Sequence, residues 1–229
     1  MLASERLLRV PSFERGLTLA DFLVPIRVGE RLSSRARHAV LIVIGTLLIV
    51  VGARLSFYLP GDPLVPVTLQ TFGVLFGGAL LGFRRGILSV LLYLILGFAG
   101  LPVFSYDATA KVYRSGLDAV ATLSGSHVVL GTTGGYLVGF VVAAALVGKL
   151  AELGWDRRVV GSVAALFVGN AAIYVVGLPW LAAAAHLSLA DTVRLGLLPF
   201  VPGDGLKLLV AAGLLPAGWW LVSRRPSDR

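Results

Sequence analysis

The apolar stretch at residues 199–222 constrains the fold of this chain most strongly. The run from Asp204 to Arg224 would make about 30 Å of helix at 1.5 Å per residue, which matches the hydrocarbon thickness of a bilayer. Asp204 and Lys207 open this stretch on one helical face. Ionisable groups at the rim of an apolar zone are costly, so by default they indicate a functional site with each other as partners. The structural alternative has Asp204 as the helix N-cap and Lys207 extending to the lipid headgroups.

Five further apolar segments precede this one, and together they predict an all-α integral membrane protein with about six transmembrane helices. The chain is 57% hydrophobic and 14% charged, with a mean hydropathy of +0.88, unlike ordinary soluble domains. Several segments fall below the roughly 20 residues of a standard span, so one or two are expected to be tilted or broken. The predicted spans are residues 39–59, 68–81, 86–100, 128–150, 159–181 and 199–222.

The placement of arginine and lysine predicts the orientation of these spans. Positive residues gather at alternate ends of a six-span layout, so those ends and both termini should be cytoplasmic. The net charge of +8 therefore indicates orientation in a lipid bilayer rather than nucleic-acid binding. Arg54, near the outer end of the first span, is an exception. The clusters that set the orientation are Arg35, Arg37, Arg84, Arg85, Lys149, Arg157, Arg158, Arg224 and Arg225.

This layout predicts that the chain has two parts. Residues 1–37 contain apolar runs too short to span, and they are predicted to form a cytoplasmic tail or an interfacial segment. Residues 38–229 are predicted to form one six-helix transmembrane domain. A connector at residues 186–198 is expected to contain an interfacial helix of its own.

The polar features gather on the outer side, where each has a ligand-binding and a structural interpretation. Gly134 and Gly135 permit close approach of a ligand or of a neighbouring helix. Tyr136 could stack on a ligand or belong to the aromatic belt. Gln70 and its neighbours Thr68 and Thr71 could contact a ligand or hydrogen-bond between helices.

Asn170 and Tyr174 lie one turn apart in the fifth predicted span, and we assign both a structural role.

Catalysis and metal binding have little support in the sequence. The chain has no cysteine, and its three histidines are isolated from one another. Gly148-Lys149 is followed by Leu150 and lacks the upstream glycine of a phosphate-binding loop. No nucleophile elbow or zinc-protease motif is present. The chain is therefore predicted not to be an enzyme, and its outer polar cluster favours binding of a small polar solute.

Several ordered motifs carry a resemblance to a known family. They are residues 65–71 (VPVTLQT), 81–86 (LGFRRG), Tyr93 with 97–104 (GFAGLPVF), 134–140 (GGYLVGF) and 199–207 (PFVPGDGLK). Together they resemble the BioY family, the substrate-binding (S) components of energy-coupling factor (ECF) biotin transporters. The resemblance covers the chain from the first span to the C-terminus.

The resemblance implies a six-helix S-component fold with an outward-facing biotin pocket covered by loops. It implies a prokaryotic plasma-membrane protein without its own cofactor, whose partners are a transmembrane coupling protein and two ATPases that use the ATP. Asp204 and Lys207 would be the polar anchors for biotin. The other site residues would be Gln70, Phe104, Gly134, Gly135 and Tyr136, and residues 101–126 would gate the pocket. Two alternatives stay open: an S component for another small vitamin, and a membrane assembly protein without transport function.

Overall fold

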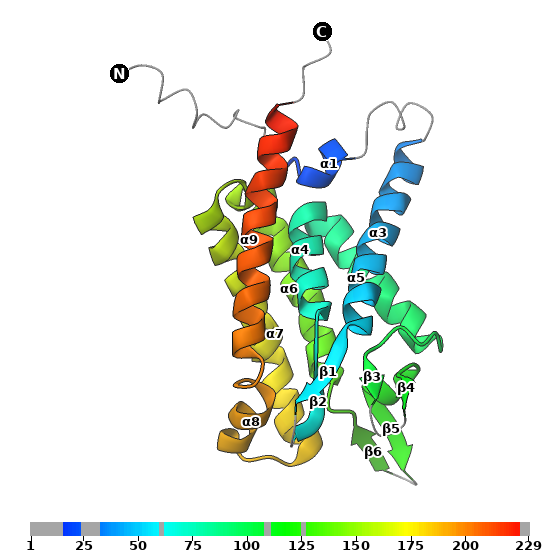
Figure 1. Cartoon of the computed structure of the whole chain (residues 1–229). Coiled ribbons are helices and arrows are strands. Elements are labelled where there is room, and N and C mark those ends of the chain that lie inside the picture. The colour runs from blue at the N-terminus through cyan, green and yellow to red at the C-terminus, as the bar shows by residue number, and fades with distance from the viewer. Residues whose placement is uncertain (1–15, 24–32, 60–61, 108–110, 125–126, 225–229) are drawn as a thin grey trace.

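The computed structural model describes residues 16–23, 33–59, 62–107, 111–124 and 127–224. Within these ranges six helices form a bundle (Figure 1). They are α3 (Ser34–Arg54), α4 (Gln70–Leu81), α5 (Phe83–Phe98), α6 (Gly134–Glu152), α7 (Val159–Ala185) and α9 (Val201–Ser223). Four of them, α3, α6, α7 and α9, are long and apolar enough to cross a membrane. The helical membrane bundle predicted from the sequence is confirmed.

The two remaining helices of the bundle are short. α4 has 12 residues and α5 has 16, so at 1.5 Å per residue they measure about 18 and 24 Å. Gly82 separates them with a φ of +84°, a conformation that a residue without a Cβ adopts at little cost. The close packing of α6 against this turn also needs small residues, because a Cβ on Gly148 would lie 2.6 Å from the Gly82 carbonyl carbon.

The ends of two predicted spans are strands rather than helix. α3 stops at Arg54, and β1 (Ser56–Leu59) then pairs antiparallel with β2 (Asp62–Thr68). The fourth predicted span begins with β6 (His127–Leu130), so α6 starts only at Gly134. Both strands are apolar and continue an apolar run, which is why they were assigned to the spans.

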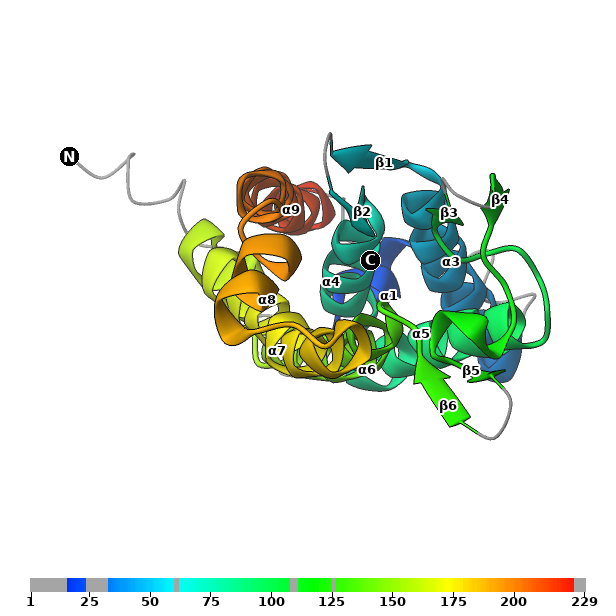
Figure 2. The same ribbon diagram turned by 90° about the horizontal axis from the view of Figure 1, so that it is seen from below.

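The predicted polar loop at residues 101–126 is largely folded. β3 (Tyr106–Asp107) pairs with β4 (Val112–Tyr113), and after the 3₁₀ turn η2 (Leu117–Ala119), β5 (Ala121–Ser124) pairs with β6. All three hairpins lie at one end of the bundle, with α8 (Leu189–Gly196) beside them (Figures 1 and 2). α8 lies in the connector where an interfacial helix was expected.

Arg54, the exception to the charge pattern, attaches one of these hairpins to the bundle. Its guanidinium donates a hydrogen bond to the Pro102 carbonyl at 2.5 Å and lies 3.9 Å from the centre of the Tyr113 ring. The charge therefore has a local structural use, which explains why it does not follow the orientation rule.

At the opposite end of the bundle, the short helix α1 (Leu19–Leu23) packs against α4 and α9 (Figure 1). Leu19 and Ala20 are buried, and Leu19 joins a small core with Trp219 and Val222 of α9. Helix α1 of the predicted N-terminal segment is therefore packed against the bundle. Residues 1–15 and 24–32 lie outside the described ranges. Arg225 also lies outside them.

Candidate functional site

A cavity lies at the hairpin end of the bundle, with an empty volume of about 620 Å³ including its mouth. Its wall combines aromatic and aliphatic side chains with a few polar groups from β2 and from five helices of the bundle. The lining residues are Val65, Pro66, Thr68, Gln70, Thr71, Tyr93, Phe104, Ser105, Thr133, Tyr136, Leu137, Phe140, Ile173, Tyr174, Phe200, Asp204 and Lys207.

Asp204 is the buried acceptor in this wall. One carboxylate oxygen, Oδ1, accepts from Lys207 Nζ at 3.0 Å and from Thr71 Oγ1 at 3.4 Å. The other, Oδ2, accepts from Tyr174 Oη at 2.5 Å and from Asn170 Nδ2 at 3.3 Å. Four donors from three helices of the bundle therefore hold one carboxylate, which offsets part of the cost of burying its charge.

Lys207 completes this cluster from the same face of α9. Its ammonium also donates to Thr71 Oγ1 at 3.2 Å, so Thr71 accepts from Lys207 while its hydroxyl faces Asp204. The predicted alternative, an N-cap and an extended lysine, is wrong. α9 has Phe200 at its N-cap position, Asp204 lies a turn inside the helix, and the Lys207 side chain is largely buried.

Asn170 and Tyr174 were assigned a structural role from the sequence, but both contact Asp204, and Tyr174 also lines the cavity. Thr71 was left open and belongs to the same cluster. The signal for the α7 pair was their spacing, since residues four apart share one helical face. Nothing in the sequence alone connected that face with Asp204, which is 30 residues further along the chain.

Gln70 and Phe104 both line the cavity, as predicted for site residues. Gln70 is buried and donates from Nε2 to Tyr93 Oη at 2.7 Å. Phe104 packs edge-on against Tyr93 at 5.4 Å between ring centroids. Gly97 makes room for this ring, because a Cβ there would lie 2.1 Å from it.

Tyr136 presents its ring to the cavity, but its hydroxyl is already used. The Oη donates to the Gly196 carbonyl at the end of α8, at 2.9 Å. Gly177 leaves space for the ring, and Tyr174 packs edge-on against it at 6.3 Å. Tyr136 can therefore supply an apolar and aromatic wall, while its hydroxyl fixes α8 against the bundle.

Gly134 and Gly135 lie outside the cavity wall given above, and they face Trp180 of α7. A Cβ on Gly134 would lie 2.7 Å from the Trp180 indole, and a Cβ on Gly135 would lie 2.2 Å from Trp180 Cβ. The indole Nε1 donates to the Gly131 carbonyl at 2.8 Å. The geometry therefore supports the packing interpretation of these two glycines, whose contribution to the cavity is to let α6 and α7 approach closely.

Helix α3 carries the small residues Gly45, Gly52 and Ala53, and all three are buried inside the bundle. A Cβ on Gly45 would meet the Ser89 side chain at 2.4 Å, and one on Gly52 would meet the Leu69 carbonyl oxygen at 2.7 Å. These residues pack α3 against α4 and α5.

In the part of the chain that the structure describes, no group of three or more His, Asp or Glu side chains could hold a metal ion. The charged cluster in the cavity holds one carboxylate and one ammonium among neutral donors. Such a set can orient a polar solute by hydrogen bonds and charge.

The fold and the cavity define a multi-pass membrane protein with a buried polar site at one end of its helix bundle. The BioY family model matches residues 27–224, so the chain belongs to the BioY family. A relative called biotin transporter BioY, from Thermotoga maritima, is 38% identical over 167 residues, covering 73% of this chain and 86% of the relative. A probable biotin transporter BioY from Pyrococcus horikoshii is 35% identical over 178 residues, covering 77% and 93%.

One solved structure has a similar fold. It is the crystal structure of the S-component for biotin from an ECF-type ABC transporter, with a TM-score of 0.68 and 23% sequence identity. The match covers 84% of this chain and all of the other. The S-component-like bundle predicted from the sequence is thereby confirmed.

Proposed function

We propose that this chain takes up biotin as the substrate-binding membrane subunit, or S component, of an ECF-type transporter. The observation that carries the proposal is the buried cluster around Asp204 and Lys207 in a chain of the BioY family. Residues 38–229 form the substrate-binding domain, and the chain itself performs no chemistry on its ligand.

The cluster suits the polar head of biotin. A carboxylate accepts from the ureido N–H groups, and an ammonium donates to the ureido oxygen or to the valerate carboxylate. Because Asp204 already accepts four hydrogen bonds, a ligand N–H would replace one of the two longest, from Thr71 or Asn170. Tyr136 and Phe104 supply walls for the thiophane ring and the aliphatic tail.

The energy for transport comes from partners in this proposal: one transmembrane coupling protein and two ATPases. The chain lies in the plasma membrane of a prokaryote, with the cavity outside and both termini in the cytoplasm. The support is the position of the basic residues, since Arg84, Lys149 and Arg158 lie at the ends of bundle helices far from the hairpins. Loops at the hairpin end gate the cavity, and Phe104 and Ser105 are the part of residues 101–126 that lines it.

Thermal unfolding of the detergent-purified protein with and without biotin tests this function. Biotin at 100-fold over its dissociation constant should stabilise the folded state by about 2.7 kcal/mol. Asp204→Ala should weaken biotin binding at least tenfold, because a charge-assisted hydrogen bond contributes about 1.5–3 kcal/mol. Isothermal titration then gives the two dissociation constants directly.

Asp21→Ala is the matched control, since Asp21 lies at the opposite end of the bundle and outside the cavity wall. It should bind biotin as the wild type does. If the wild type gains no stability from biotin but gains it from another vitamin, the ligand assignment is wrong and the site stands. An unchanged biotin affinity in folded Asp204→Ala would remove Asp204 from the site.

A further inference from the structure

A second hollow lies at the end of the bundle opposite the cavity, between the ends of α3, α5 and α6. Its empty volume is about 1150 Å³ including the space open to the outside. Both basic and apolar side chains line it. The lining residues are His38, Ile42, Leu81, Phe83, Arg84, Arg85, Leu88, Lys149 and Glu152. We refer to it as the basic groove.

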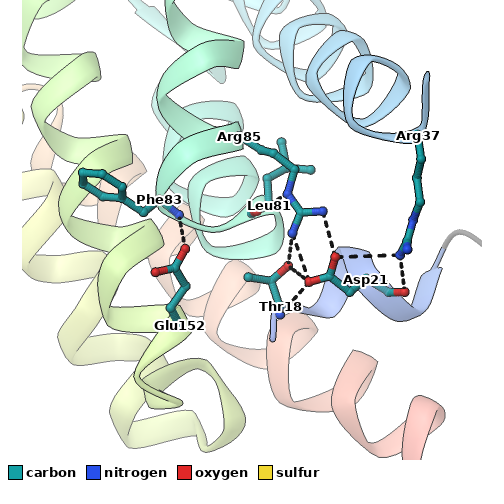
Figure 3. Close-up of polar contacts among 7 residues, drawn as sticks. All are labelled: Thr18, Asp21, Arg37, Leu81, Phe83, Arg85 and Glu152. Atoms are coloured by element: carbon teal, nitrogen blue, oxygen red, sulfur yellow. Dashed lines mark hydrogen bonds and ion pairs between the residues drawn. The ribbon is translucent and has the colours of Figure 1, made fainter. Parts of the chain in front are cut away.

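The basic groove has more positive than negative charge. Arg85 is committed to Asp21 and Thr18 of the N-terminal segment, and Glu152 accepts from the Phe83 backbone N–H (Figure 3). Lys149 lies 3.5 Å from Glu152 but its side chain is 60% exposed, so it can turn toward another anion. Arg84 is exposed and has no acceptor among the described residues. Two cations of the basic groove are therefore available to a ligand.

An apolar stripe continues from the groove along the outside of α5. Leu88, at the groove, is followed by Leu91 and Ile95, and all three are exposed. Their spacing of three and four residues places them on one helical face. α5 belongs to a bundle with four helices that are long and apolar enough to cross a membrane, so we expect this stripe to face the acyl chains of the surrounding leaflet.

We propose that the basic groove binds an anionic phospholipid from the leaflet at this end of the molecule. Its phosphate lies between Arg84 and Lys149, and one acyl chain follows the stripe from Leu88 to Ile95. Basic residues at a membrane surface attract anionic headgroups, and arginine pairs well with phosphate oxygens. A soluble anion would use the two cations but leave the apolar lining and the stripe without a partner, which is why a lipid fits better.

Native mass spectrometry of the intact protein, titrated with phosphatidylglycerol or phosphatidylcholine, measures this binding. The wild type should bind phosphatidylglycerol more tightly than phosphatidylcholine. Arg84→Gln/Lys149→Gln should weaken phosphatidylglycerol binding about 30-fold, since each basic residue contributes about 1 kcal/mol and 1.4 kcal/mol is tenfold. Arg35→Gln/Arg158→Gln is the matched control, because it removes the same charge from exposed residues outside the groove.

Binding retained in the control and lost in the groove variant supports the proposal, and thermal unfolding checks that both variants are folded. Equal affinity of the wild type for the two lipids overturns it. So does an equal loss in both double variants, which would mean general surface attraction. If inorganic phosphate at the same concentration displaces phosphatidylglycerol, the groove is an anion site and the lipid assignment fails. Unchanged lipid binding together with lost capture of an acidic partner subunit would assign the groove to a protein instead.

Discussion

The two ends of the bundle each hold an aspartate paired with a basic side chain, and the two pairs differ in burial. At the cavity end the Asp204 and Lys207 side chains are 5% and 12% exposed. At the other end the Asp21 and Arg37 side chains are 22% and 29% exposed, and Arg85 also binds Asp21 at 2.8 Å (Figure 3). The first pair lies in a cavity wall, whereas the second fastens a five-residue helix to the bundle.

The difference in burial indicates that the two ion pairs have different roles. A buried pair gains little net stability, because the cost of removing both charges from water consumes much of their attraction. A polar ligand that exchanges hydrogen bonds with the buried pair would give it a use other than stability. A pair nearer to water keeps part of its hydration and can hold a segment in place at small cost.

Removing one partner of the buried pair should have the largest effect. Lys207→Met leaves Asp204 as a buried carboxylate without its cation, so the stability of the ligand-free protein should fall by about 3 kcal/mol. Asp204→Asn/Lys207→Met removes both charges and should regain most of that loss without regaining biotin binding. Thermal unfolding in detergent measures the first effect and biotin titration the second.

Arg37→Met at the opposite end is the comparison for this experiment. It should cost only about 1 kcal/mol, since Asp21 keeps Arg85 and its local hydrogen bonds. Equal losses from Lys207→Met and Arg37→Met would mean that burial does not separate the two pairs. A double variant that binds biotin would show that the buried pair has a structural role alone.

The helix bundle was predictable because membrane thickness sets the length of apolar runs and basic residues mark their ends. Asp204 and Lys207 could be recognised as candidate site residues because charge is conspicuous in an apolar run. The hairpins were not predicted, since an apolar strand that continues an apolar helix has no distinguishing periodicity over a few residues. For this reason β1 and β6 were assigned to the helical spans.

The neutral members of the site were the hardest to recognise. Asn170 and Tyr174 can hydrogen-bond equally well to a helix or to a ligand-binding group, and only the packing of α7 against α9 directs them to Asp204. Gly134 and Gly135 posed a related problem. A glycine indicates that something approaches closely, but the sequence does not say whether it is a ligand or the Trp180 side chain.

Removing the charge of a second carboxylate at the α1 end should raise the stability of the protein, by less than Lys207→Met lowers it. Asp156, in the turn η3 (Trp155–Arg157), is buried and accepts from Trp219 Nε1 at 2.7 Å. Burial raises the pKa of Asp156 to about 6, although the Trp219 hydrogen bond and the Arg157 charge act against this. Because the folded pKa exceeds the unfolded one, its stabilising contribution is complete below about pH 4 and is lost as the pH rises through 6.

Asp156→Asn keeps an acceptor for the indole and removes the charge. At pH 7.5 the variant should therefore be more stable than the wild type, by about 1–2 kcal/mol. Thermal unfolding between pH 4 and 8 should show a difference that grows with pH, with the exposed Asp118→Asn as control. A variant that is less stable at pH 7.5 would mean that the carboxylate is needed in its charged form.

An effect of about the same size as that of Arg37→Met is expected at Asp21. Burial alone would raise its pKa, but hydrogen bonds from Arg85 and Thr18 and the Arg85 charge outweigh it, so the pKa of Asp21 is lowered. Its contribution to stability is therefore present above about pH 4 and is lost as the pH falls through the lowered pKa. Asp21→Asn should lower the Tm by a few degrees at pH 7, as expected for about 1 kcal/mol, and the difference should shrink toward pH 3.

The biotin affinity of Asp21→Asn tests whether the α1 end affects the cavity end. Asp21 lies beyond the ends of the helices that carry the cavity wall, so Asp21→Asn should change the dissociation constant of biotin less than twofold. A loss of affinity as large as that expected for Asp204→Ala would show that α1 controls the cavity across the length of the bundle. The contrast between a ligand-binding pair and a fastening pair would then be replaced by coupling between them, measurable as a non-additive effect in the Asp21→Asn/Asp204→Ala double variant.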